Sequence, residues 1–355
     1  MDQQSNLQKT FSDLVVTLGA YEYIFAVVDL LINSFHVYIL SRRHMRTSSM
    51  NSILLGIALV DMVFPVIAIK KRVRIWIFGS GNCTAPEGFL ETNIDWILYT
   101  LRDDFRRCST WLGVSLAAVR TISVRYSMNQ KYSFVSRSSF GRQLVFSVIG
   151  VSSLLSVFYY LRFAIQNNGT PWTPPLGCDK YGQGVSAPVY TFQETELFTF
   201  SNGGFRKFYM VFVGILAKFI PCLLFPLLTL LLIRELAKAK MARKKAKQDE
   251  KKDLTTRLVI YMTVSFFVIE FPIGICFLIE ATASTFNSGS VSTSIIQLLN
   301  MVYVVMTLTH FFICFSMSSQ YRRTVKNTLC RGKQKTSASF VSVIQNARSE
   351  TSAFH

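Results

Sequence analysis

One stretch of the sequence, from Thr92 to Tyr126, constrains the fold of this chain more than any other. It is typical of a single helix that is long enough to cross a lipid bilayer. Yet five charged side chains stand close together in its outer half, at Arg102, Asp103, Asp104, Arg106 and Arg107. Charges at membrane depth are costly unless they face protein or water and find partners there. Such a helix requires other helices around it, with polar groups inside and apolar groups outside.

The rest of the chain supplies these helices. Of its 355 residues, 50% are hydrophobic and only 16% are charged, which is too apolar for a soluble domain of this length. Seven apolar runs are long enough to be membrane spans, at roughly 19–41, 50–69, 92–126, 141–161, 207–233, 254–280 and 293–317. We therefore expect an all-α membrane protein with a seven-transmembrane helix bundle over residues 19–317. No internal repeat of the kind found in transporters is visible.

The distribution of basic residues predicts the orientation in the membrane. The net charge is +18, and most Lys and Arg lie in the loops after the first, third and fifth runs and in the C-terminal tail. Basic loops stay in the cytoplasm, so residues 1–18 are predicted to be extracellular and the C-terminus cytoplasmic, in the plasma membrane. The basic loops indicate membrane lipid as a partner, and no nucleic acid is expected. No cleavable signal peptide is visible.

One basic cluster, from Lys70 to Arg74, breaks this rule because it follows the second run on the predicted outer side. Either its side chains extend to the outer headgroups, or they form a basic rim that attracts an acidic ligand.

Polar side chains at membrane depth predict a network in the core. Asn33 lies in the first run, and Asp61 lies in the second at a depth of about 17 Å. A carboxylate there must be protonated, paired or bound to a cation. Asn33 and Ser109 are candidates to reach Asp61. A sodium ion at Asp61 and a purely structural polar network are the two alternatives.

Arg106 lies about 21 Å outward of Arg120, and Glu270 lies about 24 Å outward of the cytoplasmic start of its helix near Leu254. The two are therefore at similar depth and are predicted to form a buried ion pair. Glu270 stands two residues before Pro272. The pair is therefore either a switch that a competing ligand unbalances or a permanent structural strut. Asp103 and Arg107, four residues apart with the acid first, are expected to pair within their helix. Lys218 either faces the same pocket or extends to the headgroups.

Several motifs resemble known receptors. The stretches MRTSSMNSILLGIALVD and WLGVSLAAVRTISVRYSM resemble the second and third helices of rhodopsin-like G-protein-coupled receptors. FFVIEFPIGI and FSMSSQYRRTV resemble the nematode serpentine chemoreceptors of class W, which are related to peptide receptors. The resemblance spans roughly residues 20–330. It implies a receptor that binds an extracellular ligand, with a neuropeptide favoured, and that activates a heterotrimeric G protein by opening a cytoplasmic cavity at Arg120.

The resemblance also implies roles for individual residues. G-protein coupling is assigned to Arg120, Thr121, Val124 and Arg125. The ligand pocket is assigned to Arg102, Asp103, Arg106, Lys218, Glu270 and Asn300. The activation core is assigned to Asn33, Asp61, Ser109, Pro221, Pro272 and His310. Arg102 stands where amine-binding relatives carry an Asp, which argues against an amine and for an anionic or peptide ligand.

Two departures from the family pattern concern activation. Val119 replaces the acid that normally restrains the key arginine, and His310 begins the segment where most relatives read Asn-Pro-x-x-Tyr. Both changes remove partners that stabilise defined states in relatives. Raised basal activity is therefore a hypothesis for this chain.

Of the seven cysteines, only Cys83 and Cys178 lie in predicted outer loops, where the environment is oxidising. Their pairing would tie the second outer loop to the third helix, as the family's disulfide does, although the family's usual cysteine position is Asp95 here. Asn82 and Asn168 begin glycosylation sequons. Cys330, in the tail, is either palmitoylated or a free thiol.

Two segments outside the runs have predicted roles. The second outer loop, roughly 162–207, is expected to be a lid or part of the binding surface, with disorder as the alternative. Residues 318–331 place Tyr321, Val325 and Leu329 on one face, which is typical of a short amphipathic helix on the inner membrane surface. Residues 332–355 are expected to be a disordered cytoplasmic tail.

Other classes of function find less support. No catalytic constellation is visible, no cofactor is expected, and the four histidines do not have metal-ligand spacing. No lysine occurs between Asp253 and Val325, which excludes a retinal Schiff base on the seventh helix. The alternatives are a chemosensory receptor for small environmental molecules, a transporter or channel, and an uncoupled receptor that acts through dimerisation.

Overall fold

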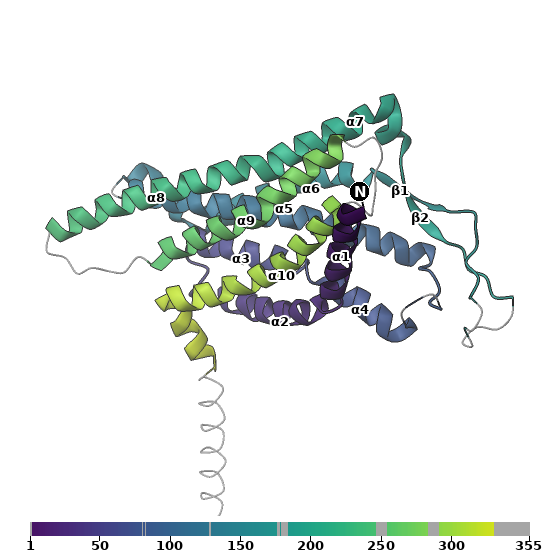
Figure 1. The fold of residues 1–355 in the computed structure, drawn as a ribbon. Helices are drawn as coiled ribbons and strands as arrows, with labels where there is room; N and C mark the ends of the chain where they lie inside the picture. Colours follow the sequence, from purple (N-terminus) through teal and green to yellow (C-terminus); the bar gives the residue numbers. More distant parts are fainter. Residues whose placement is uncertain are drawn as a thin grey trace, which may run out of the picture.

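The computed structural model describes residues 2–79, 81, 83–127, 129–175, 178, 184–245, 254–282 and 291–329. The elements are α1 (Asp2–Gly19), α2 (Glu22–Leu40), α3 (Ser49–Asp61), α4 (Val66–Phe78), α5 (Phe89–Arg125), η1 (Gln130–Ser136), α6 (Ser138–Tyr160), β1 (Phe163–Asn167), β2 (Tyr190–Glu194), α7 (Glu196–Gly214), η2 (Ile215–Phe219), α8 (Ile220–Lys245), α9 (Leu254–Thr282) and α10 (Val291–Met317). The long helices lie side by side as a bundle, with the strands at one end (Figure 1).

The central helix is α5, which packs against α3, α6 and α8. Its inner half is apolar and forms the main core, in which Cys108, Leu112 and Ala117 are fully buried. Five described segments are long and apolar enough to cross a membrane, namely Glu22–Leu40, Ser49–Phe78, Ser138–Tyr160, Glu196–Lys238 and Ser294–Ser316. Burial of α5 by its neighbours is what allows its outer half to carry charge.

The second apolar run is two helices rather than one. It breaks at residues 62–65, between α3 and α4, where Pro65 stands just before the first turn of α4. Proline favours that position because its ring sets φ and its missing N–H has no partner to lose there. The placement of Lys70–Arg74 in an outer loop is wrong, since these residues lie on α4.

The fifth run changes its helical period midway. A π-turn, η2, separates α7 from α8 and ends just before Pro221. Proline has no N–H to donate to the carbonyl of Ala217, so the widened turn takes up the interruption. Further out, α7 kinks at Phe200–Gly203, where Ser201 and Asn202 have positive φ. The helix therefore begins earlier than predicted, and its kink turns the chain towards β2.

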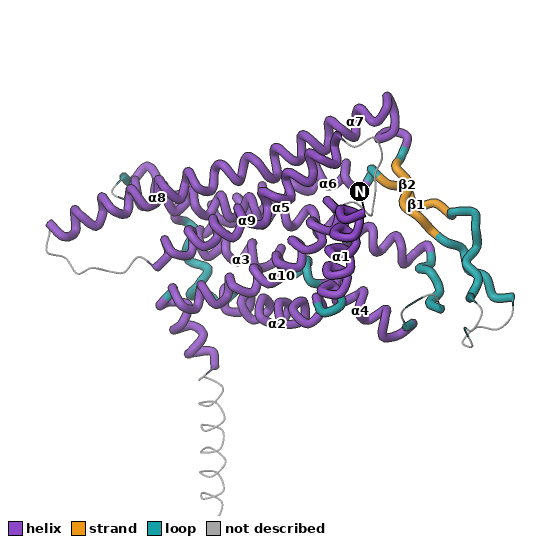
Figure 2. The backbone as a smooth tube through the Cα atoms, in the orientation of Figure 1, coloured by secondary structure: helices purple, strands orange, loops and turns teal. Residues whose placement is uncertain are grey.

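The prediction of an all-α fold is wrong in the second outer loop. There, β1 and β2 form an antiparallel hairpin with Phe163 opposite Glu194, and it extends from the outer end of the bundle (Figure 2). Trp96 of α5 packs against Phe163 and Phe192 at its base. The predicted Cys83–Cys178 disulfide is present. The loop is thus attached to the bundle at two places.

Two helices flank the bundle. The N-terminal segment, which the sequence did not indicate as helical, forms α1 and crosses the outer end next to α10 (Figure 1). Residues 319–329 are helical as well. In that segment Tyr321 and Val325 are buried against Ile39 and Cys314. The C-terminal tail and Cys330 lie outside the described residues.

Candidate ligand site and ionic core

A buried ionic cluster joins three elements in the outer half of the bundle. Arg106 of α5 donates from Nε to Glu270 Oε1 of α9 at 2.5 Å, which confirms the predicted ion pair. Lys218 of η2 donates from Nζ to Glu270 Oε2 at 2.5 Å, so its side chain faces inward. Arg106 Nη1 also donates to Asn300 Oδ1 of α10. All four side chains are buried.

The local backbone explains why Lys218 reaches this cluster. An extra residue per turn in η2 rotates Lys218 towards α9. Gly274, one turn after Glu270, permits the close approach, because an added Cβ at Gly274 would lie 3.0 Å from Lys218 Cβ. A π-turn and a glycine together set the position of this cation.

The outer end of the site is rich in positive charge. Arg102, one turn outward of Arg106, stacks over the rings of Tyr99 and Phe64 at 4.9 Å and 5.6 Å. Arg106 stacks over Tyr303 at 4.9 Å and lies 5.9 Å from the same Phe64 ring. Within the described residues, Arg106 Nη2 is buried and has no hydrogen-bond acceptor.

The remaining charges of α5 face another helix. Arg107 donates to Ser152 at 2.9 Å and Ser156 at 2.7 Å, both on α6. It also donates to Asp103 at 3.0 Å, as predicted. Asp103 therefore pairs on the α6 side and does not join the Glu270 cluster with which it was grouped. The serines were missed, although their spacing of four residues on an apolar helix was a readable signal.

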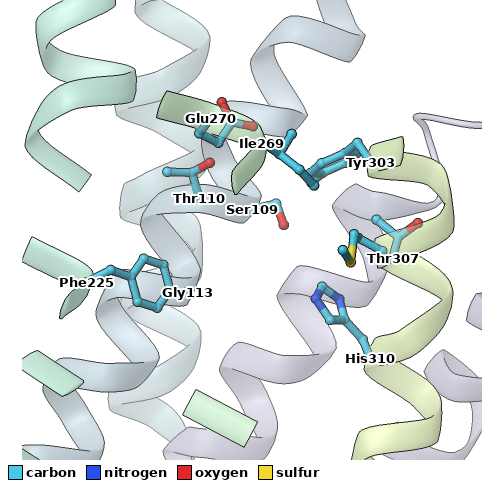
Figure 3. Close-up of a pocket in the computed structure, with 10 residues that line it drawn as sticks. Ser109, Thr110, Gly113, Phe225, Ile269, Glu270, Tyr303, Thr307 and His310 are labelled. Atoms are coloured by element: carbon cyan, nitrogen blue, oxygen red, sulfur yellow. The ribbon is translucent and has the colours of Figure 1, made fainter. Parts of the chain in front are cut away.

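A cavity lies inward of the ionic cluster, between α5, α8, α9 and α10. It is lined by Ser109, Thr110, Gly113, Phe225, Ile269, Glu270, Tyr303, Met306, Thr307 and His310. Glu270 stands at one end and His310 at the other (Figure 3). The cavity thus separates the ionic cluster from the polar groups around Asp61.

The core network differs from the predicted one. Asn33 donates to Asp29 Oδ1 at 2.7 Å rather than to Asp61, and Thr307 donates to the same Asp29 oxygen at 2.9 Å. Asp61 accepts from the Tyr303 hydroxyl at 3.1 Å, and its other oxygen lies 3.2 Å from His310 Nδ1. Asp29 was missed, although an acid inside a 19-residue apolar helix is a clear signal.

The inner end of α5 holds the residues assigned to G-protein coupling. Arg120 is half-buried, and its Nη1 lies 3.8 Å from Met50 Sδ. Thr121 is buried and donates to Ala117 O at 2.8 Å, and Val124 packs at the edge of the core. Arg125 is exposed and stacks over Tyr126. Of these four side chains, Arg120 and Arg125 are thus more accessible than the buried Thr121.

At the outer rim, two basic residues of the Lys70–Arg74 cluster are paired with acids, whereas Lys71 and Arg72 lie over the rings of Tyr99 and Tyr23. Lys70 binds Asp95, and Arg74 binds Glu91 at 2.8 Å and Glu87 at 3.2 Å. Burial and the neighbouring Asp95 carboxylate raise the pKa of Glu87 above its usual range. Asp95, at the position where the resemblance implies a cysteine, thus forms an ion pair with α4.

Of the two predicted glycosylation sites, one lies within the described residues. Asn168 is exposed on the loop after β1, and Asn82 lies outside the described residues.

Comparison with known proteins gives one family. The model of the serpentine type 7TM GPCR chemoreceptor Srw matches residues 20–332, which is most of the chain. No curated protein matches the chain. The match spans the bundle, from the start of α2 past the end of α10. The chain therefore belongs to the Srw family of serpentine, seven-transmembrane G-protein-coupled chemoreceptors and is a multi-pass protein of the plasma membrane.

Proposed function

We propose that this receptor binds an extracellular ligand outward of the Arg106–Glu270–Lys218 cluster and activates a heterotrimeric G protein at its cytoplasmic end. The observation that carries the proposal is the cluster itself. It joins α5, η2 and α9 through one carboxylate, two residues before Pro272. A proline frees a backbone carbonyl and allows a helix to bend. A ligand that changes the cluster would therefore act on the point where α9 bends most easily.

The proposed signal runs along α5 and α9. Arg106 and Arg120 stand on the same helix, and the cavity between them gives side chains room to rearrange. A ligand shifts such an equilibrium only by binding one state more tightly than the other. Opening of the inner ends of α5, α8 and α9 around Arg120 would then form the G-protein site.

The proposed ligand is a neuropeptide. Its support is the hairpin-bearing outer loop, which the disulfide holds near the outer end of α5 and which offers a broad surface. The second candidate is a small environmental molecule, and the description of the matched family as chemoreceptors favours it. The two ligand classes differ in size and not in the ionic chemistry they would meet.

The proposed topology has seven spans over residues 19–317, an extracellular segment 1–18 and a cytoplasmic segment 332–355. Residues 318–331 would lie on the inner membrane surface. The basic loops between the spans support this orientation.

The test is G-protein activation in cells that express the full chain, screened with a neuropeptide library and a library of small odorants. Arg120→Ala should abolish the response, and Arg142→Ala, at an exposed position near the start of α6, is the matched control. Surface labelling checks that both variants reach the membrane. Ligand-independent ion currents without nucleotide exchange would overturn the receptor mechanism in favour of a channel.

A further inference from the structure

The outer half of the bundle contains more cations than it can neutralise internally. Arg106 and Lys218 share the single carboxylate of Glu270. No carboxylate lies within ion-pair distance of Arg102 in the part of the chain that the structure describes; Glu22 acts on it only from further away. Within the described residues, these three cations therefore share one close carboxylate partner, in a region where charge is weakly screened.

The surplus charge is concentrated at one place. Arg102 and Arg106 are four residues apart on α5, so their side chains lie on the same face of the helix. Both guanidinium groups lie within 6 Å of the Phe64 ring, at 5.6 Å and 5.9 Å. Two like charges so placed repel each other, and aromatic faces offset only part of that cost.

Unused hydrogen-bonding capacity is found at the same place. Arg106 is 6% exposed, its Nε and Nη1 are occupied, and its Nη2 has no acceptor within the described residues. A buried donor without an acceptor destabilises the folded state, because it has lost its hydrogen bonds to water. The guanidinium of Arg102 stacks on ring faces, which leaves its planar edge available for an acceptor.

We infer that Arg102 and the Nη2 atom of Arg106 form a binding site for a carboxylate carried by the receptor's ligand. This inference rests on the proposed ligand site and names the chemical class of its occupant. A carboxylate has one negative charge and two oxygens, and guanidinium groups bind that pattern in pairs. It neutralises one surplus cation and supplies the acceptor that Nη2 lacks. A cationic amine meets repulsion at the same position.

The same site links binding to movement. A ligand carboxylate attracts Arg106 away from Glu270, which keeps Lys218 as its partner. The contact between α5 and α9 then weakens while the contact between η2 and α9 remains. Pro272 lies about half a turn further along α9. The weakened contact is therefore next to the point where α9 bends most easily.

The test measures binding to the purified full-length receptor by thermal shift at constant ionic strength. The probes are synthetic tetrapeptides and aromatic small molecules, each made as a free carboxylate and as the matching primary amide. We expect stabilising probes to be carboxylates and to lose at least about tenfold in apparent affinity as amides. Arg102→Gln should remove the difference between acid and amide, and Arg102→Lys should keep much of it.

The matched control is Arg72→Gln. Arg72 is also an outer cation stacked on aromatic rings, those of Tyr23 and Trp76, but it lies on α4. This variant should keep the preference for carboxylates. Amides that bind as well as acids, no binding by any acid, or a preference that survives Arg102→Gln would each overturn the inference. Carboxylate binding without G-protein activation would instead contradict the proposed function alone.

Discussion

Glu270 is one carboxylate shared by two buried cations, and this ratio sets the energetics of the cluster. Arg106 binds one of its oxygens and Lys218 binds the other. Transfer of an ion from water to a protein interior costs several kcal/mol, which only a close opposite charge offsets. Glu270 therefore contributes to stability through two attractions, whereas either cation contributes through one attraction and adds a repulsion.

Glu270→Gln should lower the free energy of unfolding by about 3–5 kcal/mol, because it leaves two buried cations without an anion. Lys218→Met is the informative comparison. It removes the surplus cation and leaves an Arg106–Glu270 pair, so its cost should stay within about 1.5 kcal/mol. Thermal melts of the purified receptors measure both changes. Equal losses for the two variants would contradict a cluster in which two cations depend on one carboxylate.

At the scale of single residues, the sequence predicts how deep a side chain lies in the bundle, but not towards which neighbouring helix it points. Arg106 and Glu270 meet because a fixed rise per residue puts them at the same level. Asn33 was matched with the wrong acid, since Asp29 lies one turn away on the same helix and is reached first. A prediction of the side-chain direction is harder than a prediction of depth, because the direction depends on the rotation of each helix about its axis.

Two close contacts of α6 decide how it packs in the bundle. An added Cβ at Gly141 would lie 2.5 Å from the carbonyl oxygen of Ser49, at the start of α3. Gly56 of α3 likewise meets Val145 of α6, with an added Cβ 2.7 Å from its side chain. Backbone cannot move aside as a flexible side chain can, so Gly141 is the stricter of the two positions.

Gly141→Ala should lower the free energy of unfolding by about 1–3 kcal/mol or more, because α3 and α6 must separate to admit the methyl group. Gly150→Ala on the same helix is the matched control, since an added Cβ there meets nothing within 4 Å. Both changes gain helix propensity of up to about 1 kcal/mol, so their difference isolates the clash. A melting temperature of Gly141→Ala equal to or higher than that of Gly150→Ala would refute the close approach of α3 and α6.

The helix at residues 319–329 is attached to α2 by a buried polar contact. The Tyr321 hydroxyl lies 2.7 Å from His36 Nδ1, and both side chains are 1% exposed. Tyr321→Phe should therefore cost about 1–3 kcal/mol, because the hydrogen bond of a buried imidazole nitrogen is lost. Proteolysis after residue 317 should become faster as the helix detaches.

Tyr38→Phe provides the control for this prediction. Tyr38 is on α2 as well, but it is 48% exposed and its hydroxyl bonds only Arg42 among the described residues. Its stability and its proteolysis rate should match those of the unmodified receptor. Indistinguishable behaviour of the two variants would show that the His36–Tyr321 contact does not hold the helix.

At the scale of elements, the sequence indicated the number and order of the apolar runs, but not where the helical period changes. The break at residues 62–65 and the π-turn before Pro221 both change which side chains of the following helix face the core. The sequence alone therefore leaves Lys218 open between pocket and headgroups, although Pro221 marks the place. The hairpin of the outer loop escaped prediction for another reason: its two strands are separated by more than twenty residues of sequence.

The molecule as a whole places its two proposed functional ends on one helix. The ionic cluster occupies the outer half of α5, Arg120 the inner end, and the cavity lies between them. Packed interiors transmit displacements because they switch between discrete arrangements and do not deform smoothly. The balance between resting and active states then depends on what restrains each end, so removal of a restraint at either end should change signalling.

The inner end of α5 carries the hypothesis of raised basal activity. Val119 stands where the resemblance implies an acid that restrains Arg120, and it is 3% exposed within the apolar core. Loss of an ion pair worth about 0.5–1 kcal/mol raises the active population about two- to fivefold when that population is small. Nucleotide exchange without ligand should therefore exceed that of Arg120→Ala, while Arg142→Ala, at an exposed position of α6, should keep the basal rate. A basal rate equal to that of Arg120→Ala, at equal surface expression, would mean that other contacts hold the inner end closed.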